Sequence, residues 1–375
     1  MKKLNKERIY TEFVELVQIP CHTLKEKEIF GALKAKLVAL GFTVKQDDAG
    51  KKLGGEVGNL WAFLKGNCPT AKRVLLSGHM DCVEPCTGVK PVRRDGNIYS
   101  DGTTILGGDD KSGIVGILEG IRMILENEEP HGDIQVLFTI AEEGGVNGSK
   151  NMNPAFLNAD IGYALDSEGA PGEIVTSAPG QNRLTFKVIG KTAHGGVAPE
   201  KGLNAIILAG KALAALEHYG RIDEETTSNI GIIQGGAATN IVPDVVEIFC
   251  DARSRNADKL YKQTEYLKKT FTEVVEANGG KVEIKEWVAY PSFALTEADE
   301  VIKVAVAAAT NGKLPIDITV TGGGSDANFI NAAGVPCAIL GTGMQEVHTK
   351  DEFIKEEDLY NTPLIVYEIL KAACQ

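Results

Sequence analysis

Long apolar runs alternate with helical patterns along this chain of 375 residues, and this alternation limits the folds that it can adopt. Residues 73–79 and 133–140 are nearly uninterrupted apolar runs of strand length, which is typical of strands buried on both faces of a sheet. Between them, from Ser112 onward, apolar residues recur every three or four positions, as on one face of a helix. Because strand and helix alternate, we predict an α/β sheet covered by helices on both faces.

The pattern changes in the middle of the chain. Six elements are predicted there in the order β-α-β-β-α-β, which is the ferredoxin-like unit and a complete domain in itself. They cover residues 184–188, 203–219, 229–234, 246–254, 257–278 and 282–288. After the sixth element strands and helices alternate again. We therefore predict a mixed-sheet α/β domain built from residues 1–179 and 291–375, interrupted by an inserted ferredoxin-like domain at 180–290.

Two helices are predicted before the first strand. Ile9, Phe13 and Leu16 lie on one face of an amphipathic segment. Thr23 and Glu26 have the spacing of a capping box, which would open a second helix that ends at a glycine.

Composition and charge exclude several partner classes. The 39 basic and 51 acidic side chains give a net charge of −12, which argues against nucleic acid or anionic lipid as the main partner. We find no stretch of roughly 20 apolar residues and no signal-peptide pattern, so we expect no membrane partner. The seven scattered cysteines suggest reduced thiols, and hence a cytoplasmic location.

Polar residues with metal-ligand chemistry stand where predicted strands end and helices begin. His79 and Asp81 close the run 73–79, and residues two apart on a strand point to the same face, so the carboxylate can orient the imidazole. Asp109 and Asp110 follow two glycines at the start of a helix. An aspartate there is also a common helix cap, and a histidine at the end of a strand can simply be hydrogen-bonded in a loop.

Further carboxylates and a second histidine follow later strands. Glu142 and Glu143 close the run 133–140, where adjacent carboxylates repel each other unless a cation compensates them; a solvated turn is the alternative. Asp166 ends another apolar strand, and His348 follows a glycine-rich turn. Taken together, these histidines and carboxylates would suit two cations about 3.5–4 Å apart.

The motifs around these residues resemble those of a known family. They are His79-Met-Asp81, Gly-Gly-Asp109-Asp-Lys111, Glu142-Glu143-Gly, Ala-Leu-Asp166 and Glu346-Val-His348. In this order they resemble the five motifs of the M20 family of dinuclear zinc peptidases. Residues 101–109 and 190–194 resemble the peptidase T (tripeptide aminopeptidase) branch. The resemblance implies a phosphorylase/hydrolase-like catalytic domain, and an inserted domain that serves as a lid and in dimerisation.

The resemblance also implies a role for each site residue. His79 and Asp166 would bind one zinc ion, Glu143 and His348 the other, and Asp109 together with a water or hydroxide would bridge the two; cobalt or manganese could replace zinc. Asp81 would orient His79. Glu142 would be the general base that takes a proton from the attacking water and passes it to the leaving amine.

The inserted domain and one loop would supply the substrate contacts. His194 resembles the family histidine that stabilises the oxyanion. Asn240 and Arg253 would grip the substrate backbone and its terminal carboxylate, which the planar guanidinium suits; a surface salt bridge is the alternative for Arg253. Gly324 and Ser325 would line the substrate site. A homodimer through the inserted domain is expected.

The resemblance predicts a metal-dependent exopeptidase that acts on short peptides and removes the N-terminal residue of tripeptides. The alternative within the same scaffold is an amidohydrolase, such as a deacylase of N-acyl amino acids or a carboxypeptidase. A non-catalytic peptide-binding homologue is the third possibility, but it would have no reason to keep Glu142 beside a complete ligand set.

Overall fold

The computed structural model describes residues 4–374 and divides into two compact units. Unit 1 comprises Met1–Ser177, Ala294–Thr321 and Ser325–Gln375. Unit 2 comprises Ala178–Phe293 and Gly322–Gly324. Each unit has a sheet and a hydrophobic core of its own.

Unit 1 is built on a mixed sheet of eight strands in the order β1-β2-β6-β3-β7-β19-β8-β18. The strands are β1 (Thr43–Gln46), β2 (Leu60–Leu64), β3 (Val74–His79), β6 (Ile134–Thr139), β7 (Ile161–Ser167), β8 (Glu173–Val175), β18 (Asp317–Thr319) and β19 (Cys337–Gly341). The four central strands β6, β3, β7 and β19 are parallel, whereas β1, β2 and β8 introduce antiparallel pairs. The predicted mixed sheet is therefore confirmed, and the parallel strands all end at one edge.

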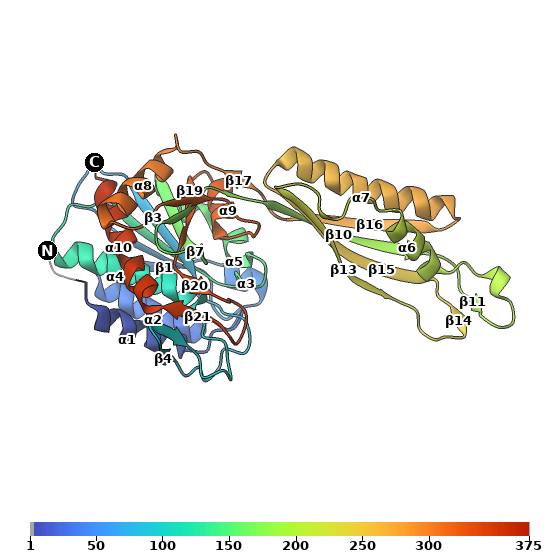
Figure 1. The fold of residues 1–375 in the computed structure, drawn as a ribbon, viewed down its shortest axis with the longest axis horizontal. Helices are drawn as coiled ribbons and strands as arrows, with labels where there is room; N and C mark the ends of the chain where they lie inside the picture. Colours follow the sequence, from blue (N-terminus) through green and yellow to red (C-terminus); the bar gives the residue numbers. More distant parts are fainter. Residues whose placement is uncertain (1–3, 375) are drawn as a thin grey trace. The chain divides into compact units, whose positions relative to one another are not determined.

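Helices lie on both sides of this sheet (Figure 1). They are α1 (Lys6–Val17), α2 (Lys27–Ala39), α3 (Ala49–Leu53), α4 (Gly108–Glu126), α5 (Asn147–Lys150), α8 (Glu300–Gly312), α9 (Asp326–Ala332) and α10 (Glu356–Ala372), with a 3₁₀ turn at Pro154–Phe156. Within residues 4–374, none of the helices has both the length and the apolar character that crossing a membrane requires.

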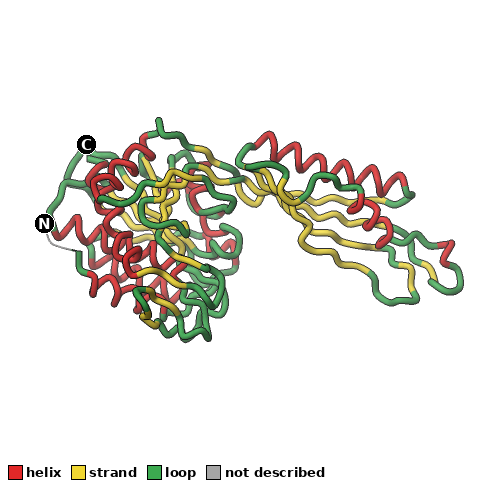
Figure 2. The backbone as a smooth tube through the Cα atoms, viewed as in Figure 1, coloured by secondary structure: helices red, strands yellow, loops and turns green. Residues whose placement is uncertain are grey.

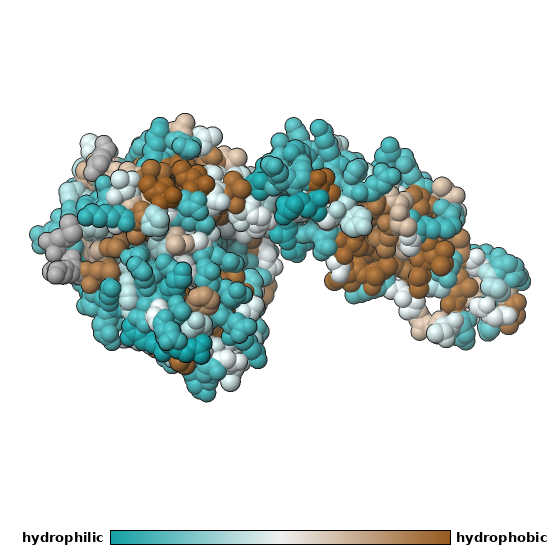
Figure 3. All heavy atoms as spheres, viewed as in Figure 1, coloured by the Kyte–Doolittle hydropathy of each residue, from teal (hydrophilic) through white to brown (hydrophobic). Residues whose placement is uncertain are grey.

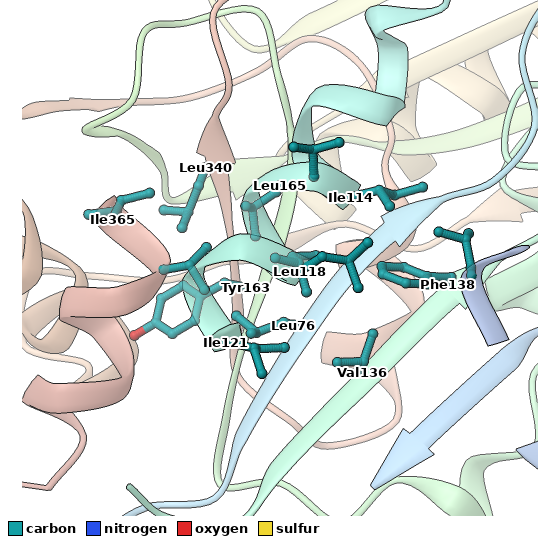
Figure 4. Packing of buried hydrophobic residues seen from close by; sticks show 14 of the residues in the cluster. Leu76, Ile114, Leu118, Ile121, Val136, Phe138, Tyr163, Leu165, Leu340 and Ile365 are labelled. Carbon is teal, nitrogen blue, oxygen red and sulfur yellow. The ribbon is translucent and has the colours of Figure 1, made fainter. Parts of the chain in front are cut away.

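The core of unit 1 explains why the apolar runs became central strands. Figure 4 shows Leu118 of α4 between side chains from several elements, among them Leu76 of β3 and Leu165 of β7. All three are fully buried. At about 1.5–3 kcal/mol for each buried aliphatic side chain, this packing supplies the driving force that orders the strands and α4.

A small four-stranded sheet in unit 1 was not expected from the sequence. It has the order β20-β21-β5-β4 and consists of β4 (Val92–Arg94), β5 (Asn97–Tyr99), β20 (Met344–Gln345) and β21 (Phe353–Lys355). Strands of two or three residues are too short to show a period in the sequence. The sheet holds both ends of the loop that carries His348.

Unit 2 has the topology predicted for the insertion. Its strands are β10 (Gly180–Ile189), β12 (Gly220–Arg221), β13 (Thr226–Gly235), β15 (Val245–Ser254) and β16 (Lys281–Tyr290), and its helices are α6 (Ala205–Ala214) and α7 (Ala257–Ala277). The order β12-β13-β15-β10-β16, antiparallel throughout, is that of a ferredoxin-like sheet extended by the short β12. Figure 2 shows α7 running along these strands, and Phe271 of α7 stacks on Phe186 of β10 at 4.0 Å between ring centroids.

Two pairs of short strands and one 3₁₀ turn complete the chain. A two-stranded ribbon in unit 2 joins β11 (Ala193–His194) and β14 (Ile241–Val242), and a 3₁₀ turn follows at Pro199–Lys201. The strands β9 (Ser177–Ala178) and β17 (Phe293–Ala294) form a second pair.

The predicted capping box at Thr23 and Glu26 is wrong. Glu26 occupies the position before α2, but its side chain makes no cap hydrogen bond to the helix. Instead its Oε1 accepts the amide of Ala141 at 3.0 Å, and the hydroxyl of Thr23 donates to Asp81 Oδ2 at 2.7 Å. These tertiary contacts replace local capping, so the two side chains hold Asp81 and the backbone at Ala141 in place.

Candidate metal centre

The parallel strands bring together the residues that the sequence places at their ends. His79 ends β3, Asp166 lies near the end of β7, and Glu143 follows β6 by four residues. Asp109 enters from the start of α4, and His348 comes from the loop between β20 and β21. Since parallel strands end at the same edge of a sheet, residues far apart in sequence meet there.

Asp109 lies between the two histidines. Its Oδ1 is 2.9 Å from His79 Nε2, and its Oδ2 is 3.2 Å from His348 Nε2. The two carboxylate oxygens thus face different imidazoles, which is the disposition of a bridging ligand. Although burial opposes ionisation, the two histidines hold the pKa of Asp109 below its usual range.

Each histidine has a second carboxylate beside it. Asp166 Oδ1 lies 3.7 Å from His79 Nε2, and Glu143 Oε2 lies 2.8 Å from His348 Nε2. Hydrogen bonds to Asp109 and Glu143 raise the pKa of His348 to about 10. Glu143 Oε1 is buried and has no hydrogen-bond partner among residues 4–374, so it is available to a ligand.

Negative charge accumulates at this edge. Burial, with the charge of Asp109 beside it, raises the pKa of Asp166 to about 8. Burial and then the charge of Asp166 raise the pKa of Glu142 well above its usual range. Carboxylates held together in this way are best compensated by a bound cation.

The donor set suits divalent metal ions. His79, Asp109 and Glu143 offer ligand atoms that lie within 4.8 Å of one another. Imidazole nitrogens mixed with carboxylate oxygens suit zinc and its neighbours in the first transition series. His79 Nδ1 is 3.1 Å from the carbonyl oxygen of Asp81. In the neutral imidazole, Nδ1–H donates to this carbonyl, and the lone pair of Nε2 faces Asp109.

Asp81 makes further contacts besides the expected one. Its carboxylate Oδ1 lies 3.6 Å from His79 Nδ1, within ion-pair distance, and its carbonyl oxygen lies nearer to the same nitrogen, at 3.1 Å. The carboxylate accepts the backbone amides of Glu142 (3.0 Å) and Glu143 (3.3 Å), and also the hydroxyl of Thr23. Asp81 therefore connects the strand of His79 with the segment that carries the two glutamates.

Two further buried residues support the site, although the sequence predicted no role for them beyond helix capping. Asp110 Oδ2 accepts the backbone amide of His79 at 3.1 Å. Lys111 is fully buried, and its Nζ donates to the carbonyl of Met80 at 2.8 Å and lies 3.1 Å from Cys82 Sγ. The one available signal was their position directly after Asp109, because the partners lie about 30 residues away.

Within unit 2, His194 ends β11, and Asn240 immediately precedes β14 of the same ribbon. His194 pairs with Ile241, and Gly195 donates its amide to the carbonyl of Asn240 at 2.8 Å. His194 is exposed, and its Nδ1 accepts the amides of Gly196 (3.2 Å) and Val197 (3.1 Å). An Nδ1 that accepts two amides requires the ring proton on Nε2, which is then free to donate.

The other residues predicted to contact the substrate already have partners or close neighbours within the protein. Arg253 Nε donates to Asp251 Oδ2 at 3.0 Å, as the salt-bridge alternative anticipated. This hydrogen bond does not use the two outer guanidinium nitrogens. Ser325 is buried, and its hydroxyl caps α9. At Gly324 an added Cβ would lie 2.4 Å from the ring of Tyr290, so no side chain fits.

Comparisons with known proteins agree with this arrangement. The model of peptidase family M20/M25/M40 matches residues 75–372. The chain is 42% identical to YqjE, an uncharacterized protein of Bacillus subtilis (strain 168), over 372 residues, which cover 99% of this chain and 100% of that protein.

Two solved structures are similar over the whole chain. Aminopeptidase PepT from Bacillus cereus ATCC 10987 gives a TM-score of 0.94 at 42% identity, covering 99% of this chain and 100% of that one. A tripeptidase from Staphylococcus aureus subsp. aureus Mu50 gives 0.95 at 39% identity, covering 100% of both chains. The chain therefore belongs to peptidase family M20/M25/M40.

Proposed function

We propose that this peptidase is a metal-dependent exopeptidase that removes the N-terminal residue of short peptides, with tripeptides as its preferred substrates. The observation that carries the metal dependence is Asp109, whose two oxygens face His79 and His348 separately. The names of the two similar solved structures, an aminopeptidase and a tripeptidase, support the choice of substrate. A cytoplasmic location stays a prediction from the sequence.

In this proposal five residues hold two ions of the zinc class. His79 and Asp166 would hold one, Glu143 and His348 would hold the other, and Asp109 would be shared between them. Such ions, when bound, polarise the scissile carbonyl and lower the pKa of water. With three protein donors for each ion, the site keeps positions open for substrate.

Glu142 acts as the general base. Its carboxyl is buried, immediately precedes the proposed ligand Glu143 and lies within reach of the charge of Asp166, so it can accept a proton at the metal centre. It takes a proton from the attacking water and returns it to the leaving amine. Asp81 holds the Glu142 amide at 3.0 Å and so restricts where this carboxylate can reach.

The remaining predicted site residues contact the substrate. His194 donates its Nε2 proton to the oxyanion, a role supported by the two amides that occupy Nδ1. Arg253 binds the terminal carboxylate of the peptide through the nitrogens that Asp251 does not use, and Asn240 binds its backbone. Gly324 and Ser325 line the substrate site.

The proposal is tested with a triglycine-type peptide whose N-terminus is free or acetylated, each with and without a chelator, alongside metal analysis of the purified protein. We expect two equivalents of metal and chelator-sensitive cleavage of the free tripeptide only. Cleavage that survives the chelator would contradict metal dependence. Cleavage of acetylated substrates alone would favour the deacylase alternative, and metal binding without any turnover would favour the non-catalytic homologue.

We also propose that two copies of the chain pair through unit 2. Ile206 and Ile207 of α6 and Ile232 and Ile233 of β13 are 44–57% exposed. Figure 3 shows hydrophobic residues gathered over this part of unit 2. Because β13 lies beside only the two-residue β12 at its outer edge, a second copy can extend the sheet there. Sedimentation should show a dimer that Ile233→Lys weakens; a monomeric wild type would contradict this.

A further inference from the structure

Glu352 is a buried carboxylate at the end of the loop that carries His348. It immediately precedes β21, and its side chain is 1% exposed. None of the sequence motifs included it, because it lies 243 residues from the segment that it contacts. A buried carboxylate is costly unless hydrogen bonds satisfy it, so its partners indicate what it is kept for.

Both oxygens of Glu352 bind the backbone that leads into Asp109. Oε2 accepts the amide of Gly107 at 2.8 Å, and Oε1 accepts the amide of Asp109 itself at 3.0 Å. The intervening Gly108 lets the two segments approach closely, since an added Cβ would lie 3.2 Å from Glu352 Oε1. The carboxylate thus grips the 107–109 turn at both ends.

This contact joins two segments that each supply a ligand. Glu352 lies four residues after His348, and His348 Nε2 is 3.2 Å from Asp109 Oδ2. The His348 loop and the Asp109 turn are therefore connected twice, once through the ligand side chains and once through Glu352. The second connection fixes the backbone from which Asp109 projects.

We propose that Glu352 is a positioning residue that sets the spacing between Asp109 and His348, and so the affinity of the ion site that these two residues form with Glu143. This inference rests on the proposed metal dependence. A carboxylate that only stabilised the fold would affect unfolding without distinguishing one ion site from the other. Removing the Glu352 carboxylate should affect the two ion sites unequally, because only the site of Glu143 and His348 contains a ligand from the Glu352 loop.

Three variants separate the two roles. Glu352→Gln keeps the shape of the side chain but retains one acceptor oxygen for two amides. Gly108→Ala places a Cβ 3.2 Å from Glu352 Oε1 and so displaces the carboxylate. The φ of Gly108 is not in the left-handed region, so the alanine adds no backbone strain of that kind. The control is Asp47→Asn. Asp47 is also a buried carboxylate that accepts backbone amides, those of Ala49 (3.0 Å), Asn59 (2.9 Å) and Asn153 (3.4 Å), together with the side chains of Asn59 and Trp61, but it contacts none of the ligands.

The measurement is a titration of metal-free protein with Co²⁺, followed by visible absorption and calorimetry, with circular dichroism and thermal unfolding on the same samples. We expect Glu352→Gln to weaken one of the two equivalents of Co²⁺ by roughly 10–100-fold and to alter its absorption, with a smaller change in the other. Gly108→Ala should shift the same equivalent in the same direction. Asp47→Asn should lower thermal stability and leave both affinities as in the wild type.

Each outcome decides between the roles. If Glu352→Gln lowers stability as Asp47→Asn does but binds both equivalents normally, Glu352 is a structural residue and the inference is wrong. If Glu352→Gln does not fold, Gly108→Ala decides, and unchanged binding in that variant overturns the inference. If the wild type binds no divalent metal, the proposed function itself fails, which is a separate result.

Discussion

Asp81→Asn tests the contacts of this carboxylate that the sequence did not predict. The carboxylate accepts three donors: the amides of Glu142 and Glu143 and the hydroxyl of Thr23. An asparagine side chain has one acceptor oxygen, and its NH₂ group is itself a donor. At least one of the two backbone amides is therefore left without a partner in the variant.

The magnitude follows from that count. An unsatisfied buried donor costs about 1–3 kcal/mol. At 1.36 kcal/mol for each factor of ten, the loss in kcat is about 5- to 160-fold if the whole cost falls on the transition state. The amide concerned belongs to the segment of Glu142, so we expect kcat to fall while two equivalents of metal stay bound.

The assay is steady-state cleavage of a free tripeptide by enzyme whose metal content is measured on the same preparation. Thr23→Val is a graded control because it removes only the hydroxyl donor, and we expect a loss of less than about tenfold. Thr23→Ser keeps the donor and should behave as the wild type. If Asp81→Asn loses the metal at His79 and the metal-loaded fraction turns over normally, Asp81 acts through His79 and our reasoning is refuted.

Three further predictions concern single side chains. Glu142→Gln should lower kcat by at least ~10²–10⁴-fold with unchanged metal content; loss of metal would mean that Glu142 is a ligand. His194→Ala should lower kcat by about 10²–10³-fold with metal retained, and an unaltered rate would remove His194 from catalysis. In the folded protein iodoacetamide should label Cys68 and Cys374 first, because the other five thiols are buried; mass spectrometry that finds early labelling of a buried thiol would contradict the packing.

The fold was largely predictable because its signals are local. The apolar runs that became β3 and β6 are buried along their whole length, so their composition identified them directly. Alternation along β15 likewise distinguishes a buried face from a half-exposed one. The small β4-β5-β20-β21 sheet had no such signal, because its strands are only two or three residues long.

Most of the candidate ligands were also visible in the sequence, since they stand near the end of a central parallel strand or the start of a helix, where an α/β sheet places a site. His348 lies in a loop and was identified by the motif around it. The supporting residues were not visible. Thr23 and Glu26 matched a helix-capping pattern and instead contact Asp81 and the Ala141 amide. Local spacing cannot distinguish these outcomes, because the competing partner is remote in the chain.

The class of the sheet, the ferredoxin-like insertion and most of the histidines and carboxylates of the site could be read from local patterns, because periodicity and strand ends are properties of neighbouring residues. Which atoms face one another became visible only once the chain was folded: the two oxygens of Asp109 face two imidazoles, the carboxylate of Asp81 faces the Glu142 segment, and Glu352 lies against the Asp109 turn. These contacts join segments about 30 to 240 residues apart, and burial of the shared core, not any local pattern, brings them together.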